Sequence, residues 1–362
     1  KLIPYKVLAT YKGKEFEGMR YEQLIPWHQP DNGDAFKVVI GDFVTTEDGT
    51  GIDHIAPSFG ADDFRMSKIY GLGTLTLVDK QGRFIEGCGE FSGRFVKQEY
   101  EDESNRHPES VDVEIAIMLK KENKAFKIEK YEHSYPHCWR TDKPILYYPL
   151  DSWFIKTTAL KDRMIELNKT INWQPASTGF GRFGQWLENL LDWNLSRSRY
   201  WGTPLPIWAT EDYKEMKCIG SVAELKAEIE KSVAAGFMKE NALKDFNPTD
   251  FSKDNYNKLD LHKPFVDNIV LVSSDGRPMH RESDLIDVWF DSGAMPYAQW
   301  HYPFEHKDDF NKLFPADFIA EGVDQTRGWF FTLHALAVML FDSVAYKNIV
   351  SNGLVLDKNG NK

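Results

Sequence analysis

Cysteine is scarce in this chain: Cys88, Cys138 and Cys218 are its three cysteines, and they lie far apart in the sequence. A disulfide framework is therefore not expected, and a reducing, cytoplasmic environment is the natural interpretation. No run of about 18 consecutive apolar residues occurs, so we expect no transmembrane helix and no contact with a membrane. The first residues contain no apolar stretch typical of signal peptides.

An excess of positive charge is missing as well. The chain has 44 Lys and Arg against 55 Asp and Glu, a formal net charge of −11, so the molecule as a whole does not attract polyanions. Binding to nucleic acid requires a local basic surface instead. What the chain does have is 42% hydrophobic and 27% charged residues over 362 positions, which is typical of a folded protein of two or three domains.

The first third of the chain predicts mainly β-structure. Residues 37–44 and 73–78 are rich in β-branched side chains and bounded by Gly and Asp, which is typical of strands. Residues 111–121 predict a helix. After residue 134 the apolar spacing becomes helical, first over 154–168 and then over 183–191, where apolar residues recur on one helical face.

The last third predicts an α/β fold. A capping box, Ser221 to Glu224, opens a helix that we expect to end at Gly236, and the polar residues 241–268 predict a surface insertion. Residues 318–322 predict a buried strand, followed by a helix near 325–341 and a second strand near 348–356. Strand, helix and strand in this order imply a parallel sheet.

Two patterns have simple alternative explanations. Gly179, Gly181 and Gly184 form a G-x-G-x-x-G pattern, but the residues before it do not resemble an apolar strand, so we do not predict a dinucleotide site, and a nicotinamide-dependent dehydrogenase is only a distant alternative. Cys138 has histidines nearby, but Thr141 occupies the position where a second thiolate is needed, so we expect no zinc site.

Three other segments carry candidate functional residues. Residues 49–64 combine glycines, His54 and an acidic pair ending at Asp63, which suits binding of an amine but also a solvated loop. Arg197 and Arg199 are able to bind phosphates or simply to be solvated at a helix end.

The third segment follows the predicted strand 318–322. Ligands of parallel sheets bind beyond the carboxyl ends of the strands, and a ligand with an amine and hydroxyls suits Glu321, Asp324 and Gln325. Trp289 and Trp329 are candidates for the apolar wall of such a pocket, although the commoner location of a tryptophan is the core.

Taken together, six segments resemble one family closely and occur in its order, over roughly residues 1–209 and 262–362. They are similar to the class I isoleucyl-tRNA synthetases, in the branch typical of eukaryotes and shared by some bacteria; valyl- and leucyl-tRNA synthetases fit less well. The segments are GTGIDHIAPSFGADD, SYPHCWRTDKPI, DWNLSRSRYWGTPLPIW, DVWFDSG, AEGVDQTRGWF and SNGLVLDKNGNK.

The resemblance implies an α/β chain of four parts. Residues 1–133 correspond to most of a β-rich editing domain, 134–209 return to the Rossmann-like catalytic domain, 210–283 are an insertion, and 284–362 are the second half of the catalytic domain. The family's His-Ile-Gly-His and Lys-Met-Ser-Lys motifs are not in this sequence, so we expect an internal fragment that does not itself activate isoleucine. The span 82–94 is shorter than expected for the family.

The resemblance also implies roles for single residues. In the editing pocket Asp63 would hold the α-amino group of a misacylated amino acid and His54 would help to exclude the cognate side chain, although Asp53 replaces an apolar residue usual in the family. In the synthetic site Trp289 and Trp329, with Gln325, would contact isoleucine.

The remaining implied roles concern the adenylate, the tRNA and metals. Glu321, Gly322, Asp324 and Asn352 would contact the aminoacyl-adenylate, Arg197 and Arg199 the tRNA, and Cys138 stands at a zinc-ligand position of other members. The implied parent enzyme is a cytoplasmic monomer that uses ATP and Mg²⁺ to charge the isoleucine tRNA and hydrolyses valyl errors. The alternatives are a valyl- or leucyl-tRNA synthetase fragment, a free-standing trans-editing hydrolase and a non-catalytic tRNA-binding module.

Overall fold

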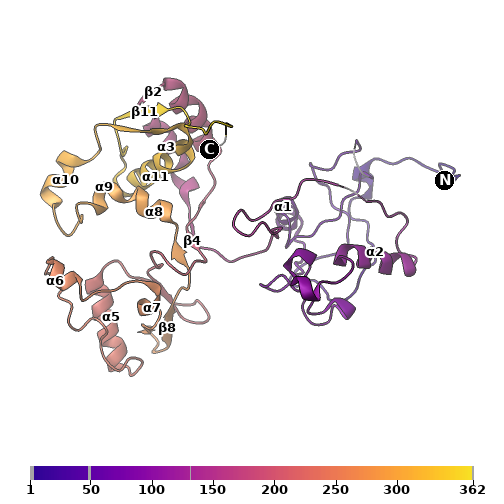
Figure 1. The fold of residues 1–362 in the computed structure, drawn as a ribbon, viewed down its shortest axis with the longest axis horizontal. Helices are drawn as coiled ribbons and strands as arrows, with labels where there is room; N and C mark the ends of the chain where they lie inside the picture. Colours follow the sequence, from indigo (N-terminus) through magenta and orange to yellow (C-terminus); the bar gives the residue numbers. More distant parts are fainter. Residues whose placement is uncertain (1–3, 48–49, 131, 361–362) are drawn as a thin grey trace. The chain divides into compact units, whose positions relative to one another are not determined.

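The computed structural model describes residues 4–47, 50–130 and 132–360, and the chain divides into two compact units, Lys1–Leu150 and Asp151–Lys362 (Figure 1). We describe each unit by itself. The expected boundary after residue 133 lies inside the first unit. Within the described ranges, no helix is long and apolar enough to cross a membrane.

The first unit is mostly irregular. The helix expected at 111–121 is confirmed, and it begins at Ser110, whose side chain accepts a hydrogen bond from the amide of Val113. A cluster of aromatic rings that includes Trp27, Phe84 and Phe91 forms part of its interior. The elements of this unit are α1 (Ala61–Tyr70), α2 (Val111–Lys121) and the 3₁₀ turns η1 (Gly13–Phe16), η2 (Gly89–Phe91), η3 (Gln98–Tyr100) and η4 (Glu103–Asn105).

The two strand predictions in this unit are wrong. Within 37–44 and 73–78 the structure has isolated bridges instead, such as Lys37 with Arg20 and Thr74 with Asp31. A β-branched segment becomes a strand only when a neighbouring segment pairs with it over several residues, and neither segment has such a partner among the described residues.

The second unit is built around a three-stranded parallel sheet of order β10–β11–β2, formed by β10 (Ile319–Gly322), β11 (Asn348–Asn352) and β2 (Asn172–Gln174). Strand β10 is followed by the 3₁₀ turn η7 (Val323–Arg327) and helix α11 (Trp329–Phe341), so the expected strand, helix and parallel strand are confirmed. Strand β10 was expected to be buried, but Ala320 and Glu321 are exposed, because this strand is at an edge of the sheet.

Helix α11 is the centre of the main core. Nine of its residues are buried, and side chains from α3 (Lys161–Asn168) and α4 (Gly184–Glu188) pack against it, including Met164 and Leu187. The helix expected over 154–168 is shorter than predicted, because its first residues form β1 (Phe154–Ile155) and the turn η5 (Thr157–Leu160). Leu191 also lies beyond the end of α4 and is exposed, unlike the predicted apolar face.

The first two glycines of the glycine-rich pattern lie in the π-helical turn η6 (Thr178–Phe183), and Gly184 is the first residue of α4. The short strand β2 precedes the pattern, but Asn172 and Gln174 in this strand are exposed, so it is not an apolar strand, as expected. The first glycine nevertheless has a packing role, because a Cβ on Gly179 would lie 2.2 Å from the ring of the buried Trp173. Gly179 therefore packs on the core, and the pattern lies in a helical segment rather than in the loop that a dinucleotide site requires.

Residues 207–281 fold around a second core. Antiparallel strands in the order β6–β5–β8–β7 pack with α5 through Trp208, Leu225, Ile229 and Leu271. Ser221 caps α5 as predicted, its side chain accepting from Glu224 N (3.1 Å). The elements are β5 (Ile207–Ala209), β6 (Met216–Cys218), α5 (Val222–Ala234), α6 (Lys253–Tyr256), α7 (Lys263–Val266), β7 (Leu271–Val272) and β8 (Pro278–Arg281).

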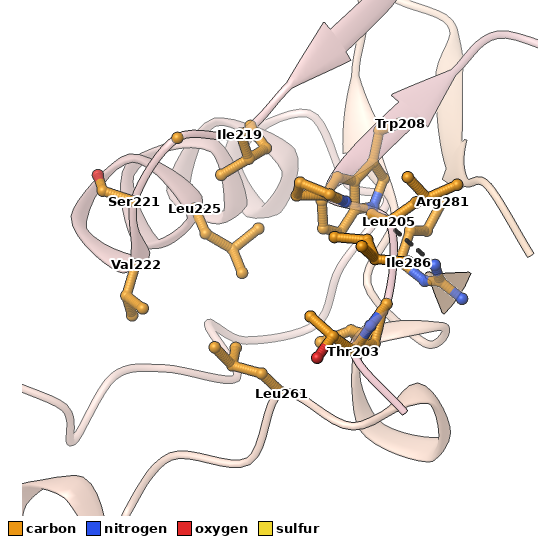
Figure 2. A pocket seen from close by; sticks show the side chains of 14 residues that line it. Thr203, Leu205, Trp208, Ile219, Ser221, Val222, Leu225, Leu261, Arg281 and Ile286 are labelled. Atoms are coloured by element: carbon orange, nitrogen blue, oxygen red, sulfur yellow. Dashed lines mark hydrogen bonds between the residues drawn. The ribbon is translucent and has the colours of Figure 1, made fainter. Parts of the chain in front are cut away.

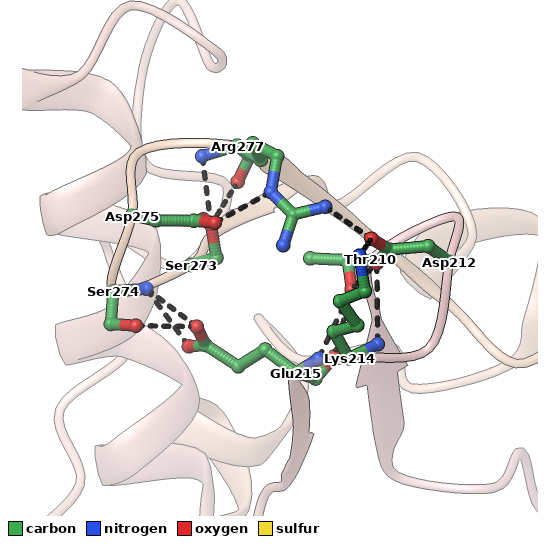
Figure 3. Close-up of polar contacts among 8 residues, drawn as sticks. All are labelled: Thr210, Asp212, Lys214, Glu215, Ser273, Ser274, Asp275 and Arg277. Carbon is green, nitrogen blue, oxygen red and sulfur yellow. Dashed lines mark hydrogen bonds and ion pairs between the residues drawn. The ribbon is translucent and has the colours of Figure 1, made fainter.

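Side chains at the turns join the two hairpins of this sheet (Figure 3). Asp212 accepts hydrogen bonds from the Thr210 hydroxyl (2.9 Å) and from Arg277 Nη1 (2.9 Å), and Glu215 accepts from Ser274. The Thr210 hydroxyl, followed by other donors, holds the pKa of Asp212 well below its usual range. The turns of β5–β6 and β7–β8 are thereby held together by polar contacts.

Short elements complete the second unit. A third apolar cluster, centred on Tyr297, Phe310 and Leu336, packs the helices after residue 287 onto α11. The elements not yet given are β3 (Trp193–Asn194), paired with β1; β4 (Ser196–Arg197), paired with β9 (Leu285–Ile286); and the helices α8 (Val288–Gly293), α9 (Met295–Ala298) and α10 (Lys307–Leu313).

Candidate functional site

The carboxyl edge of the parallel sheet brings three predicted residues together. Gly322 at the end of β10 is in register with Asn352 at the end of β11, and Glu321 is in register with Ser351. The side chains of Glu321 and Asn352 are exposed. Because ligands of parallel sheets bind at this edge, the ends of β10 and β11 are the candidate location for a ligand.

Asp324 follows directly in η7 and lies close to Gly322. A Cβ built on Gly322 would lie 2.5 Å from Asp324 Oδ1, so the absence of a side chain at Gly322 allows the carboxylate to fold back over the end of β10. Glu321 and Asp324 therefore place two carboxylates at the start of η7. An ammonium group or sugar hydroxyls are the ligands that this pair favours.

The turn between η7 and α11 joins the predicted isoleucine contacts. Gln325 Oε1 accepts a hydrogen bond from the amide of Trp329 (2.9 Å), and Trp329 Nε1 donates to the carbonyl of Ser292 in α8 (3.1 Å). A Cβ on Gly328 would lie 3.2 Å from Cη2 of Trp289, so the Trp289 ring approaches this turn closely. Trp289 is 41% exposed and is not a core residue. Both indoles thus lie at the contact between α8 and α11.

The two predicted tRNA-binding arginines lie in different environments. Arg197 Nη2 donates to Asp287 Oδ2 (2.8 Å), and its Nη1 donates to backbone carbonyls, so the guanidinium of Arg197 is paired although its side chain is 40% exposed. Arg199 is exposed and forms no ion pair among the described residues. Of the pair, Arg199 is the one available to a phosphate.

Asp287 is a residue of this region that the sequence analysis missed. It is buried, it caps α8 by accepting from the amide of Trp289 (3.2 Å), and it accepts from Trp193 Nε1 (3.0 Å) as well as from Arg197. An Asp directly before a short helix is a recognisable capping signal, but its two side-chain partners come from a distant segment.

We expect Asp287→Ala to lower the free energy of unfolding by about 2 kcal/mol, because it removes a helix cap and a charged hydrogen-bond acceptor. Urea unfolding measures this, with Asp317→Asn as control, since Asp317 pairs with Lys347 on the exposed surface and its loss should change little. Equal effects of the two substitutions would contradict a special role for Asp287.

The candidate amine-binding segment of the first unit surrounds the start of α1. Asp63 Oδ2 accepts a hydrogen bond from the amide of Ala56 (3.1 Å), two residues after His54, so the loop and the helix are joined by the carboxylate. Asp62 instead contacts Arg65 (3.5 Å). Asp63 has no cationic partner among the residues the structure describes, and His54 is exposed. Gly49, the first residue of the predicted segment, lies outside the described residues.

Cys138 lies in a tight turn. The side chain of Thr141 and the amides of Arg140 and Thr141 hydrogen-bond the sulfur and lower the pKa of its thiol to about 7. Across residues 4–47, 50–130 and 132–360, no group of three or more His, Cys, Asp or Glu side chains is arranged to hold a metal ion.

An apolar pocket of about 250 Å³ lies near the second core and contains none of the predicted site residues (Figure 2). It is bounded by Leu205 and Trp208 on one side and by Leu225 and Leu261 on the other. Arg281 at its margin donates to Asp267 (2.6 Å) and to the carbonyl of Leu205, so its charge is already satisfied.

Comparison with known proteins gives a consistent picture. The model of the family "tRNA synthetases class I (I, L, M and V)" matches residues 92–362. Curated relatives named isoleucine--tRNA ligase are 63% identical in Bacteroides fragilis (strain YCH46), 62% in Cytophaga hutchinsonii and 45% in Clostridium tetani, over 100%, 100% and 99% of this chain. These alignments cover 34%, 33% and 31% of the relatives, so the chain spans about a third of their length.

Two further details come from the same comparisons. The alignments with the first two relatives extend over 392 and 382 residues, more than the 362 of this chain, so these relatives have residues without a counterpart here. A solved leucyl enzyme (LeuRS) from Agrobacterium radiobacter K84, in a ternary complex with tRNA and LeuAMS, is 19% identical, with a TM-score of 0.30 over 48% of this chain and 21% of that chain, a likeness too low to support an inference.

Proposed function

The chain belongs to the class I tRNA synthetases of the isoleucine, leucine, methionine and valine group, and from this premise we propose that it is a central part of an isoleucine–tRNA ligase. The observation that carries the proposal is that relatives with this name match the whole chain at 62–63% identity. A valyl or leucyl enzyme, a free-standing editing hydrolase and a bare tRNA-binding module are less well supported by that match.

In the proposed reaction the carboxylate of isoleucine attacks the α-phosphorus of ATP, forming isoleucyl-adenylate and releasing pyrophosphate. A ribose hydroxyl at the 3′ end of the isoleucine tRNA then takes the isoleucyl group and releases AMP. Glu321 and Asp324 would bind the ammonium and hydroxyl groups of the adenylate, with Gly322 giving close backbone access and Asn352 offering its amide. Trp289 and Trp329 would pack on the isoleucine side chain, and Gln325 would hold the turn between them.

Magnesium would neutralise charge on the ATP phosphates. The described residues hold no ready-made set of metal ligands, so we assign no Mg²⁺ or zinc ligand, Cys138 included, and derive no step through a metal. Isoleucine, ATP and the isoleucine tRNA are the proposed partners of the complete enzyme, which we place in the cytoplasm as a monomer. Arg199, with Arg197 beside it, is the proposed tRNA contact.

The proposal includes a hydrolytic editing site in residues 1–133. An apolar pocket discriminates a missing methylene by only about 1–3 kcal/mol, a limit for which isoleucyl-tRNA synthetases are themselves the standard example. A second site that accepts valine is therefore useful. Asp63 would hold the ammonium of the misacylated valine, His54 would help to exclude isoleucine, and a positioned water would attack the ester. No protein nucleophile is needed.

We expect Trp329→Ala in the complete enzyme to raise the KM for isoleucine at least tenfold in ATP–pyrophosphate exchange, because about 1.5–3 kcal/mol of apolar burial of the substrate is lost. Trp139→Ala is the matched control, since this indole is 84% exposed. Exchange that depends on valine or leucine rather than isoleucine would overturn the proposed function. An unchanged KM in Trp329→Ala would overturn the assignment of that residue alone.

A further inference from the structure

A polar hollow of about 650 Å³ lies in the second unit, and none of its lining residues has a role assigned above. It is formed by the helical segment η6–α4 and the end of η7, and its lining consists of Gly181, Arg182, Gln185, Trp186, Asn189 and Arg327. No Asp or Glu belongs to this lining. In a chain with a net charge of −11, a hollow lined by two arginines and no carboxylate is a local basic site.

Both arginines of the hollow carry a positive charge that no carboxylate among the described residues neutralises. Arg182 Nε donates to the hydroxyl of Thr326 (3.0 Å), and the guanidinium of Arg327 lies over the ring of Trp186, 5.2 Å from its centroid. Neither pairs with a carboxylate anywhere in the described ranges, and both are exposed. By contrast, Arg197 and Arg281 in the same unit are each bound by an aspartate. The contacts of Arg182 and Arg327 orient the two groups without neutralising them.

The polar side chains form a row rather than a ring. Arg182 lies in η6, Gln185 in α4 and Asn189 directly after α4, so the three follow one another along this segment, and all three are exposed and line the hollow. Asn189 Nδ2 donates to the carbonyl of Gln185 (2.8 Å), which leaves its side-chain oxygen as an acceptor. A row of cations and amides suits an extended polyanion with hydroxyl groups better than a compact anion.

We propose that this hollow binds the sugar–phosphate backbone of a single RNA strand. Arg182 and Arg327 contact phosphates, and the amides of Gln185 and Asn189 exchange hydrogen bonds with ribose 2′-hydroxyls, which DNA lacks. The contact is independent of base sequence. The inference rests on the proposed function only for the identity of the natural RNA, because the binding itself follows from the charge and shape of the hollow.

The test measures binding of this chain to a fluorescent oligouridine of about 12 nucleotides by anisotropy over a series of salt concentrations. The double variant Arg182→Gln, Arg327→Gln is expected to bind about tenfold more weakly, and the slope of log K against log salt should fall by about 1.4, or 0.7 for each lost phosphate contact. Arg327→Gln alone breaks no hydrogen bond described in the structure, and we expect it to lower the slope by about 0.7.

Arg140→Gln is the matched control, because Arg140 also lies over an indole, that of Trp139, at 4.5 Å. It removes the same charge from the first unit and is expected to leave the slope unchanged. Losses in Arg327→Gln and in the double variant no larger than in Arg140→Gln would overturn the proposal. Equal binding of oligouridine and its DNA counterpart would overturn the part that assigns Gln185 and Asn189 to the 2′-hydroxyls. The probe is not a specific tRNA. Failure of the isoleucine-dependent ATP–pyrophosphate exchange would therefore contradict the proposed function without affecting the RNA-binding measurement.

Discussion

Replacing Asp63 with alanine in the complete enzyme is expected to slow hydrolysis of valyl-tRNA for isoleucine about 100-fold. The carboxylate is fixed by the amide of Ala56 at 3.1 Å and has no cationic partner among the described residues, and under the proposed function it would accept hydrogen bonds from the substrate ammonium. Without that contact the ester is no longer oriented toward the attacking water, and a misplacement of about 1 Å is enough for a loss of this size. Deacylation of valyl-tRNA, with isoleucyl-tRNA as the second substrate, measures it.

The neighbouring carboxylate provides the control for this experiment. Asp62→Asn removes the same charge one residue earlier, but Asp62 contacts Arg65, which also pairs with Asp42. We expect Asp62→Asn to keep nearly full deacylation. If Asp63→Ala and Asp62→Asn behaved alike, the assignment of Asp63 to the ammonium would be wrong, whereas isoleucine activation would be untouched in either variant.

Lowering the pH from 6.5 to about 4 is expected to reduce the free energy of unfolding of the second unit by about 3 kcal/mol, because of a single residue, His334 of α11. Burial lowers the pKa of His334 from 6.5 to about 4, despite the hydrogen bond of Nε2 with the carbonyl of Met164 (2.9 Å). The unfolded chain therefore takes up a proton near pH 6.5 that the folded chain refuses until about pH 4. The contribution of neutral His334 to the free energy of unfolding is fully present above pH 6.5. It falls by about 1.4 kcal/mol per pH unit as the pH drops through this window.

Urea unfolding of the wild type and of His334→Gln at a series of pH values tests this expectation. Glutamine does not titrate and keeps a donor for the Met164 carbonyl, so its variant should lose stability less steeply between pH 6.5 and 4. His280→Gln is the control, because His280 is exposed on β8 and its replacement should leave the slope as it is. An identical slope in the wild type and in His334→Gln would show that other groups control the acid response.

The sequence predicted those parts of the fold that depend on neighbouring residues. Helix α2 occupies the predicted range 111–121, and α5 begins at the predicted cap Ser221, because apolar spacing and capping act within a few residues. The strand, helix and strand that end at Asn352 were also predicted, since their order along the chain implies parallel pairing. Six segments in family order supported the same fold and pointed to residues at the carboxyl edge of the sheet.

Only the tertiary structure decided which distant residues meet. The bond between Asp287 and Arg197 and the approach of Arg327 to Trp186 join segments whose separation in sequence carries no signal of contact. The strand predictions at 37–44 and 73–78 were wrong for the same reason, because a strand requires a partner that composition does not specify. Local periodicity and capping thus determined helices such as α2 and α5, whereas long-range packing determined which segments pair as strands and which charged groups are neutralised by a partner.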